Sequence, residues 1–279
     1  MCIFRWPDRR PPFSLPVFWG ITDLSRAKPE PEADAMTELI YAVADIHGRR
    51  DYLDRALDLI EADGGAGAEV VFTGDLVDRG PESRAVIDTL MQGIAAGRRW
   101  QVLLGNHDRM FARFLQDGTV HDARIRSGIT WTHHKVGGLT TLASYGIEVG
   151  DTVPLPDLFA ATRQAVPAAH RDFLDALPRV LEREELLFVH AGLRPGLALA
   201  DQDPEDLIWI RDEFLDHPDP HPWLVVHGHT ALEYPQHFGN RIDLDGGTGY
   251  GRPLHPAVIE GGKCWLLTDR GRELLTPAT

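Results

Sequence analysis

The amino-acid sequence predicts an α/β fold. Its first half alternates short apolar runs with segments whose apolar residues recur at helical spacing, and its second half consists mostly of short apolar runs. Strands that alternate with helices are typical of βαβ units and a largely parallel sheet, whereas short strands without full helices between them favour antiparallel pairing. We therefore expect one α/β domain with a largely parallel first sheet and a more antiparallel second sheet.

Three strands and three helices are expected in the first half of the chain. The apolar runs LIYAVA, EVVFTG and WQVLLG indicate strands at residues 39–44, 69–74 and 100–105. The segments that follow them, residues 50–62, 82–97 and 107–117, carry apolar residues three and four apart. That spacing predicts helices with one face on the core.

The second half is expected to begin with a helical stretch and to continue with five short strands. Residues 156–180 have helical character, and Pro167 and Pro178 predict breaks in it because proline lacks the backbone donor that a helix needs. The strands are expected at residues 185–190, 223–228, 241–247, 255–260 and 263–268. Gly261 and Gly262 separate the last two runs, which predicts a β-hairpin.

Residues 1–36 differ from the rest of the chain. They are rich in proline, mix basic with acidic residues and show no sustained periodicity, which indicates a tail or an extension. Met36 opens the first regular segment and is a candidate natural start. We therefore expect a disordered or extension segment at residues 1–36 and a single domain at residues 37–279.

The composition is that of an ordinary soluble globular protein, with 43% hydrophobic and 25% charged residues. The 28 basic and 42 acidic residues give a net charge of 28 − 42 = −14. This charge argues against binding to nucleic acid or to an anionic membrane. Any anionic substrate must therefore be captured by a local cluster of cations.

The cysteine content and the hydropathy favour a cytoplasmic protein. Cys2 and Cys264 lie near opposite ends of the sequence, so a framework of disulfides is not expected. No stretch approaches the run of about 18 apolar residues that spans a bilayer. The apolar run near the N-terminus is short and is broken by Pro16, which argues against a signal peptide.

Polar residues lie at the ends of five of the expected strands or directly after them. They are Asp45 and His47 in DIHG, Asp75 in GDLVDRG, Asn106 and His107 in GNHD, His190 in HAG, and His227 and His229 in HGHT. In an open α/β sheet, ligands bind at the carboxyl ends of the strands. These residues are therefore expected at one edge of the sheets.

The residue types suit a pair of divalent metal ions. Carboxylate, imidazole and amide oxygen together favour Mn²⁺, Fe or Zn²⁺, and a bridging carboxylate can hold two ions about 3.5–4 Å apart. Each residue alone has another interpretation: Asp45 or Asp75 could cap a helix, and His190 could be a core histidine. All five positions together favour the metal site.

The five motifs, in this order, resemble those of metallophosphoesterases, and more narrowly the bacterial and phage form of the phosphoprotein phosphatase family. The resemblance extends from residue 39 to about residue 268 and includes GGLTTLASYG, LIWIRDEF and DGGTGYGRPL. It implies a calcineurin-like sandwich of two mixed sheets flanked by helices. It also implies a dimetal site at the carboxyl ends of the strands.

The resemblance implies a ligand for each metal position. Asp45 and His47 would hold the first ion, Asp75 would bridge the two, and the second ion would be completed by Asn106, His190 and His229. His229 is preferred over His227 because it occupies the histidine of the family's Gly-His pair. The two divalent ions are expected to be Mn²⁺, with Fe or Zn²⁺ as alternatives.

The resemblance also implies the catalytic groups. His107 would be the general acid and Asp78 its partner, while Arg79, Arg211 and Asn106 would contact the phosphate. A hydroxide that bridges the two ions would attack phosphorus in line, and His107 would protonate the leaving oxygen. Tyr250 could also line the cleft.

The expected substrate is a phosphoserine or phosphothreonine, with phosphotyrosine as a further substrate, in a phosphoprotein or phosphopeptide. The alternative is a symmetrical diadenosine tetraphosphate hydrolase, whose family has a small residue where this chain has Asp78. An alternative of another class is a catalytically silent phosphate-binding module, which would lack His107, Asp78 or a bridging ligand. No nucleic-acid or membrane partner is expected, and the oligomeric state is left open.

Overall fold

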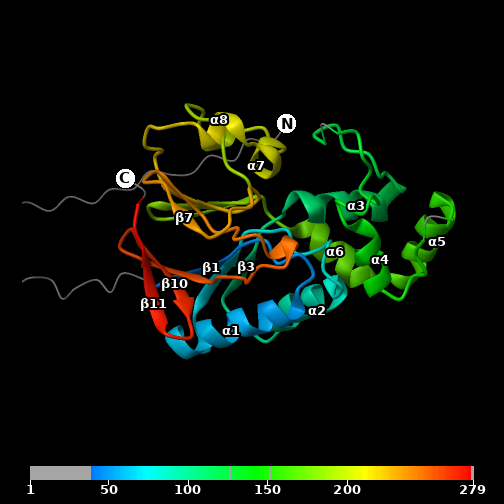
Figure 1. Cartoon of the computed structure of the whole chain (residues 1–279), viewed down its shortest axis with the longest axis horizontal. Helices are drawn as coiled ribbons and strands as arrows, with labels where there is room; N and C mark the ends of the chain where they lie inside the picture. The colour runs from blue at the N-terminus through cyan, green and yellow to red at the C-terminus, as the bar shows by residue number, and fades with distance from the viewer. Residues whose placement is uncertain (1–38, 126, 151, 278–279) are drawn as a thin grey trace, which may run out of the picture. The chain divides into compact units, whose positions relative to one another are not determined.

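Two mixed β-sheets form the centre of the structure, a computed structural model that describes residues 39–125, 127–150 and 152–277 (Figure 1). The first sheet has the strand order β11-β10-β9-β1-β2-β3, and the second has the order β4-β5-β6-β8-β7. Helices flank them, which confirms the predicted arrangement of two mixed sheets between helices. The segment predicted as an extension, residues 1–36, lies outside the described residues.

The first sheet contains both parallel and antiparallel pairs. Its parallel half is formed by β1 (Ile40–Val43), β2 (Glu69–Phe72) and β3 (Trp100–Val102), with Tyr41 opposite Val70. Its antiparallel half is formed by β9 (Ala257–Glu260), β10 (Lys263–Thr268) and β11 (Gly271–Leu275). The predicted hairpin around Gly261–Gly262 joins β9 to β10 and is confirmed.

The second sheet differs from the prediction of a more antiparallel sheet. It contains β4 (Val180–Arg183), β5 (Leu186–Val189), β6 (Leu224–His227), β7 (Gln236–His237) and β8 (Arg241–Asp243). The pairs β5–β6 and β6–β8 are parallel, whereas β4 and β7 are antiparallel edge strands. The prediction was wrong because β9 pairs with β1, so the C-terminal antiparallel strands belong to the first sheet.

The longer helices are in the first two thirds of the chain. They are α1 (Arg50–Gly64), α2 (Ser83–Ala95), α3 (Asn106–Asp117), α4 (Gly138–Ser144), α5 (Leu155–Ala165) and α6 (Ala168–Ala176). Pro167 separates α5 from α6 as predicted. Four short helices follow: η1 (Leu199–Asp201), α7 (Asp206–Trp209), α8 (Asp212–Leu215) and η2 (Thr248–Tyr250).

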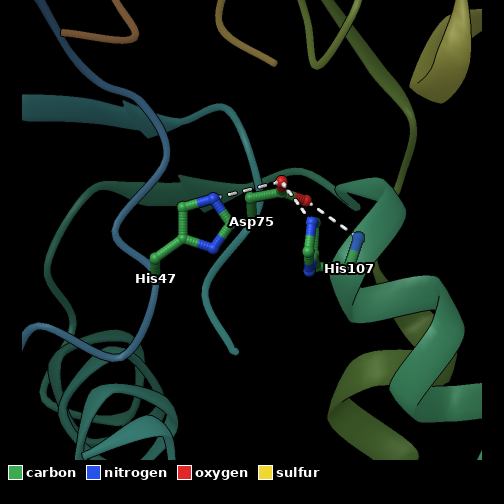
Figure 2. Close-up of side chains that lie close together, drawn as sticks. All are labelled: His47, Asp75 and His107. Atoms are coloured by element: carbon green, nitrogen blue, oxygen red, sulfur yellow. Dashed lines mark hydrogen bonds and ion pairs between the residues drawn. The ribbon is translucent and has the colours of Figure 1, made fainter. Parts of the chain in front are cut away.

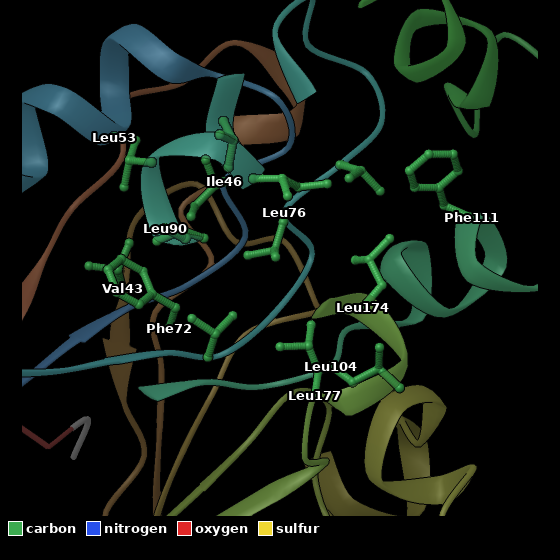
Figure 3. Packing of buried hydrophobic residues seen from close by; sticks show 14 of the residues in the cluster. Val43, Ile46, Leu53, Phe72, Leu76, Leu90, Leu104, Phe111, Leu174 and Leu177 are labelled. Carbon is green, nitrogen blue, oxygen red and sulfur yellow. The ribbon is translucent and has the colours of Figure 1, made fainter. Parts of the chain in front are cut away.

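Each central strand is buried on both of its faces, which explains why the strands read as continuous apolar runs. One face of β1 and β2 packs against the second sheet, through side chains such as Ala42, Val71 and Phe188. The opposite face packs against the helices (Figure 3), where Phe72 and Leu90 are buried in one cluster. Among the described helices, none is long and apolar enough to cross a membrane.

Candidate metal centre and active site

The loops after β1, β2 and β6 have unusual backbone conformations. Six residues in these loops have positive φ angles: Asp45 (31°), His47 (50°), Asp75 (53°), Asp78 (73°), Arg79 (67°) and His229 (69°). Elsewhere in the described chain, Glu184 is the only residue other than glycine with a positive φ. Such conformations are unfavourable for L-residues and cluster at functional sites. All six are residues that the sequence analysis selected.

A first group of predicted ligands comes together from both sheets. The Oδ1 atom of Asn106 lies 2.9 Å from Nε2 of His190 and 2.9 Å from Nδ1 of His229. Nε2 of His190 also lies 3.4 Å from Oδ1 of Asp75. Asp75, His190 and His229 are all buried, and their ligand atoms lie within 4.8 Å of one another.

The hydrogen bonding of His190 indicates what this group is built to hold. Its Nδ1–H donates to the backbone carbonyl of Thr73 at 3.0 Å, and burial lowers the pKa of His190 to about 3. The ring is therefore neutral, and Nε2 carries a lone pair. That lone pair faces the carbonyl oxygen of Asn106, which is also an acceptor. Two acceptors in contact are stabilised by a cation between them, so these residues fit a metal ion.

A second group is arranged around the other oxygen of Asp75. Nδ1 of His47 lies 3.0 Å from the backbone carbonyl of Val77 and donates to it, which leaves Nε2 as an acceptor. This Nε2 lies 3.6 Å from Oδ2 of Asp75 and 3.9 Å from Oδ2 of Asp45. Figure 2 shows His47 and His107 on opposite sides of the Asp75 carboxylate. Asp75 thus contacts both groups, one through each oxygen, as a bridging ligand would.

The pKa shifts in both ligand groups indicate that a nearby positive charge would stabilise them. Burial, and then the nearby carboxylates of Asp245 and Asp75, raise the pKa of Asp45 well above its ordinary value. Burial, and then Asp108, also raise the pKa of Asp75. Burial lowers the pKa of His229 well below its ordinary value. Divalent cations would stabilise the ionised carboxylates and the neutral imidazoles together, so the donor set fits two metal ions.

His107 is held between two aspartates. Its Nδ1 lies 2.7 Å from Oδ2 of Asp78. Its backbone N–H donates to Oδ1 of Asp75 at 2.9 Å (Figure 2). Burial, and then the charges of Arg79 and Arg211, lower the pKa of His107 well below its ordinary value. Burial raises the pKa of Asp78 to about 7. A phosphate dianion in the site would offset the arginine charges and favour the protonated imidazole.

The predicted phosphate-contacting arginines line a single pocket of about 390 Å³, together with Asn106 and Tyr250. Arg79 contacts Nε2 of His47 at 3.0 Å and Nε2 of His107 at 3.3 Å. Arg211 donates to the hydroxyl of Thr230 at 2.8 Å.

The pocket also includes Arg252, which the sequence analysis missed. Arg252 lies in the segment DGGTGYGRPL, which belongs to the family resemblance, but the sequence analysis gave it no role. Its loop is the glycine-rich segment that also carries Tyr250. Tyr250 is 65% exposed, and the guanidinium of Arg79 lies 4.9 Å from its ring centre.

Other histidines considered from the sequence lie outside the pocket. His227 is fully buried, packs edge-on against Phe214 with ring centres 5.1 Å apart, and does not line the pocket. The structure therefore brings His229, and not His227, to Asn106. His133 and His134 contact each other, with ring centres 4.2 Å apart, and neither lines the pocket.

Two carboxylates beside the site were not selected from the sequence. Asp108 is fully buried and accepts from the backbone N–H groups of Gly105 and Leu76, each at 2.9 Å, which ties α3 to the loop after β2. Gly105 has no room for a side chain, because a Cβ there would lie 2.2 Å from Oδ1 of Asp75. Asp245 is buried, and its charge contributes to raising the pKa of Asp45. Both residues could have been selected from sequence motifs, because Asp108 is the last residue of GNHD and Asp245 is the first residue of DGGTGYG.

The arrangement can perform hydrolysis at phosphorus. Two divalent cations, held by the two ligand groups, would supply Lewis-acid activation of water and of the phosphoryl oxygens. Arg79 and Arg211 can form charged hydrogen bonds to a phosphoryl group in the pocket that they line. His107 can hold a proton on Nε2 for the leaving oxygen, because its Nδ1 is occupied by Asp78.

Comparison with curated proteins finds nucleotide hydrolases. The chain is 33% identical over 160 residues to a symmetrical bis(5'-nucleosyl)-tetraphosphatase of Janthinobacterium sp. (strain Marseille), covering 57% of this chain and 46% of that protein. It is 26% identical over 205 residues to the asymmetrical bis(5'-nucleosyl)-tetraphosphatase PrpE of Anoxybacillus flavithermus, covering 67% of this chain and 74% of that protein. The chain thus spans about half the length of the first relative and about three quarters of the second.

Comparison with solved structures supports the fold. A protein described as a candidate diadenosine tetraphosphatase superposes with a TM-score of 0.57 at 23% identity, over 87% of this chain and 96% of that chain. A cold-active protein-tyrosine phosphatase of a Shewanella species superposes with a TM-score of 0.51 at 17% identity, over 86% and 81%. The family model of calcineurin-like phosphoesterases matches residues 39–251. Together with the site geometry, this match shows that the chain belongs to the calcineurin-like phosphoesterase family.

Proposed function

We propose that this chain is a divalent-metal-dependent hydrolase of dinucleoside polyphosphates, with a bis(5'-nucleosyl) tetraphosphate as the substrate. The similarity to two bis(5'-nucleosyl)-tetraphosphatases supports this substrate class. This proposal prefers the alternative from the sequence analysis to the phosphoprotein phosphatase. The two ligand groups around Asp75 would hold the metal ions, with Mn²⁺, Fe and Zn²⁺ all compatible with the donor set.

The observation that carries the proposal is the third arginine of the pocket. Arg79 and Arg211 are sufficient for one phosphoryl group, because each guanidinium can form two hydrogen bonds to phosphate. Arg252 lines the same pocket. Among the described residues, its hydrogen bonds to the Leu232 and Gly246 carbonyls both use Nη1, which leaves Nη2 and Nε for a ligand. A chain of linked phosphates would use this additional cation.

The rim of the pocket supports a nucleotide substrate as well. The ring of Tyr250 is largely exposed, and it is close to both Arg79 (4.9 Å) and Arg252 (6.0 Å). An aromatic ring in this position could stack on a nucleobase while the arginines contact the phosphates. The net charge of −14 gives a repulsive general field, so these local cations would have to capture the polyphosphate.

A second candidate function is the hydrolysis of phosphomonoesters, including those of phosphoproteins. The contact of 2.7 Å between His107 and Asp78 favours it, because an alkoxide leaving group needs a proton donor more than a phosphate leaving group does. Asp78 is also the residue that the sequence analysis used to prefer this substrate. The single pocket could admit either substrate class.

The test compares three substrates on one preparation. Chelated protein is reloaded with Mn²⁺, Mg²⁺ or Zn²⁺ and given diadenosine tetraphosphate, a phosphothreonine peptide or 4-nitrophenyl phosphate. We expect the kcat/KM for the dinucleotide to exceed that for the peptide by at least about tenfold. Chromatography of the products, two ADP or ATP with AMP, distinguishes symmetrical from asymmetrical cleavage.

The opposite ranking would reject the dinucleotide and support the phosphomonoester. No turnover of any substrate by folded, metal-loaded protein would instead support a catalytically silent phosphate-binding module.

A further inference from the structure

Each oxygen of the Asp78 carboxylate accepts a hydrogen bond from a donor other than His107. The indole Nε1–H of Trp131 donates to Oδ2 at 2.8 Å, which is the same oxygen that His107 contacts. The hydroxyl of Thr141 donates to Oδ1 at 2.7 Å and accepts from the backbone N–H of Asp78 at 2.8 Å. Asp78, Trp131 and Thr141 are all fully buried.

These donors come from a segment that the proposed function does not otherwise use. Trp131 lies in the loop between α3 and α4, and Thr141 lies in α4. The loop is held close to the site at Gly137, whose φ is +100° and where a Cβ would lie 2.4 Å from the backbone nitrogen of Arg79. Trp131 also stacks on Phe111 of α3, the helix that begins with Asn106 and His107. The segment therefore contacts both sides of the His107–Asp78 pair.

We propose that Trp131 and Thr141 are positioning residues that hold Asp78, and through it His107, in the orientation for proton donation. A carboxylate has a broad, easily rotated terminal torsion, so a single contact with His107 would not define its plane. Donors on both oxygens define that plane. A buried carboxylate also requires hydrogen bonds to be tolerated, and these two side chains supply them.

This inference rests on the proposed role of His107 and goes beyond it. A positioning residue for a proton donor has a specific kinetic signature, because proton donation matters most when the leaving alcohol is a weak acid. Phenyl phosphate needs the donor more than 4-nitrophenyl phosphate does. The ratio of kcat/KM for phenyl phosphate to kcat/KM for 4-nitrophenyl phosphate therefore measures the contribution of the donor, and a general structural loss lowers both values together.

The variants remove one donor at a time. Trp131→Phe keeps an aromatic ring without the indole N–H, and Thr141→Val keeps the shape without the hydroxyl. We expect each to lower the ratio by about tenfold, the typical range for residues that orient a reacting group. Thr141→Ser restores the hydroxyl and is expected to restore the ratio. If Trp131→Phe fails to fold, the comparison of Thr141→Val with Thr141→Ser still tests the positioning role.

Matched controls come from the same residue types elsewhere. Trp100→Phe changes a half-buried tryptophan of β3 that packs against Phe72 of β2. Thr162→Val changes a fully buried threonine of α5 whose hydroxyl donates to the Leu158 carbonyl. Neither residue lines the pocket. Both controls are expected to leave the ratio unchanged.

A measurement without turnover accompanies the kinetics. In protein loaded with diamagnetic Mg²⁺, the Nδ1–H proton of His107 is identified by NMR as the signal that His107→Asn removes. We expect Thr141→Val and Trp131→Phe to shift or broaden this signal, and the controls to leave it in place.

The outcomes separate the inference from the proposed function. An unchanged ratio and an unchanged Nδ1–H signal in Thr141→Val and Trp131→Phe would overturn the positioning role. An unchanged ratio in His107→Asn would instead reject His107 as the proton donor. If the wild-type protein hydrolyses neither aryl phosphate, the Nδ1–H signal of His107 in the variants tests the positioning role by itself.

Discussion

The Nδ1 atom of His107 lies 2.7 Å from the Oδ2 atom of Asp78, although the two residues follow different strands. This contact leaves Nε2 of His107 on the pocket side, where Arg79 contacts it. The pairing predicts that His107 donates a proton and that Asp78 makes this donation effective. It is the basis of the first prediction.

Replacement of His107 by Asn is expected to lower kcat for phenyl phosphate by about 10²–10⁴-fold, the usual contribution of a general acid. Asp78→Asn is expected to cause a smaller loss, because the imidazole remains but loses the negative charge beside its Nδ1. Steady-state kinetics on metal-loaded protein would measure both. A kcat for His107→Asn within twofold of wild type would contradict the predicted role.

Metal removal is expected to destabilise the fold, because Asp45 and Asp75 are buried and repel each other without a cation. At metal concentrations about 100 times Kd, binding contributes about 2.7 kcal/mol, which corresponds to about 5–10 °C in Tm. Calorimetry with and without chelator would measure the shift, and elemental analysis would confirm the loss of metal.

Asp75→Asn is the control for metal removal. It removes the shared ligand and one of the repelling charges, so chelation should change its Tm much less. An unchanged Tm in metal-depleted wild-type protein would contradict a preformed two-metal site.

The position of Arg252 in the pocket predicts that its substitution changes the preference between a polyphosphate and a phosphomonoester. Arg252→Gln is expected to raise KM for diadenosine tetraphosphate about tenfold, because a charged hydrogen bond to phosphate is lost, and to leave 4-nitrophenyl phosphate nearly unaffected. Arg211→Gln is the comparison, since loss of a shared phosphate contact should weaken both substrates. Equal effects of Arg252→Gln on the two substrates would remove Arg252 as a second phosphate contact.

The network around Asp63 predicts a pH dependence of stability. Asp63 accepts from Arg272 at 2.7 and 2.8 Å and from the Tyr41 hydroxyl at 2.7 Å, and the bond to Arg272 in particular holds its pKa below the ordinary value of 3.8. Because the folded pKa lies below the unfolded one, this stabilisation is complete above pH 3.8 and is lost as the pH falls through the folded pKa.

Asp63→Asn should therefore lower the free energy of unfolding by about 1 kcal/mol at neutral pH, with the difference shrinking below pH 4. Urea unfolding across this range would measure it. Asp54→Asn, which removes an exposed pair with Arg50, is the control and should have little effect. A difference for Asp63→Asn that grows on acidification would contradict the network.

Much of the fold followed from local patterns. The strands β1, β2, β5 and β6 are buried on both faces, so their apolar runs were long enough to recognise. The structure adds β4, a partly exposed edge strand with the sequence VLER, and β7, which has two residues. Their patterns are too short or too polar to distinguish from loops. The pairing of β9 with β1 was also missed, because strand order depends on contacts between distant segments.

The sequence by itself determined which kind of site to expect in this protein. The residue types Asp, His and Asn at the ends of apolar strands indicated a divalent metal site, and the five motifs in their order resemble those of metallophosphoesterases. The tertiary structure decided which atoms meet. The backbone N–H of His229 donates to Asp45, 184 residues away, and Nδ1 of His190 is fixed by the Thr73 carbonyl, 117 residues away.

Only the folded chain revealed Arg252 in the pocket and the donors Trp131 and Thr141 on Asp78. The physical reason is the separation along the sequence over which each interaction acts. Side-chain periodicity and turn chemistry act over a few residues, so they are visible in the sequence. Hydrogen bonds between distant loops depend on how two sheets and a helical segment pack, and that packing is a property of the whole domain.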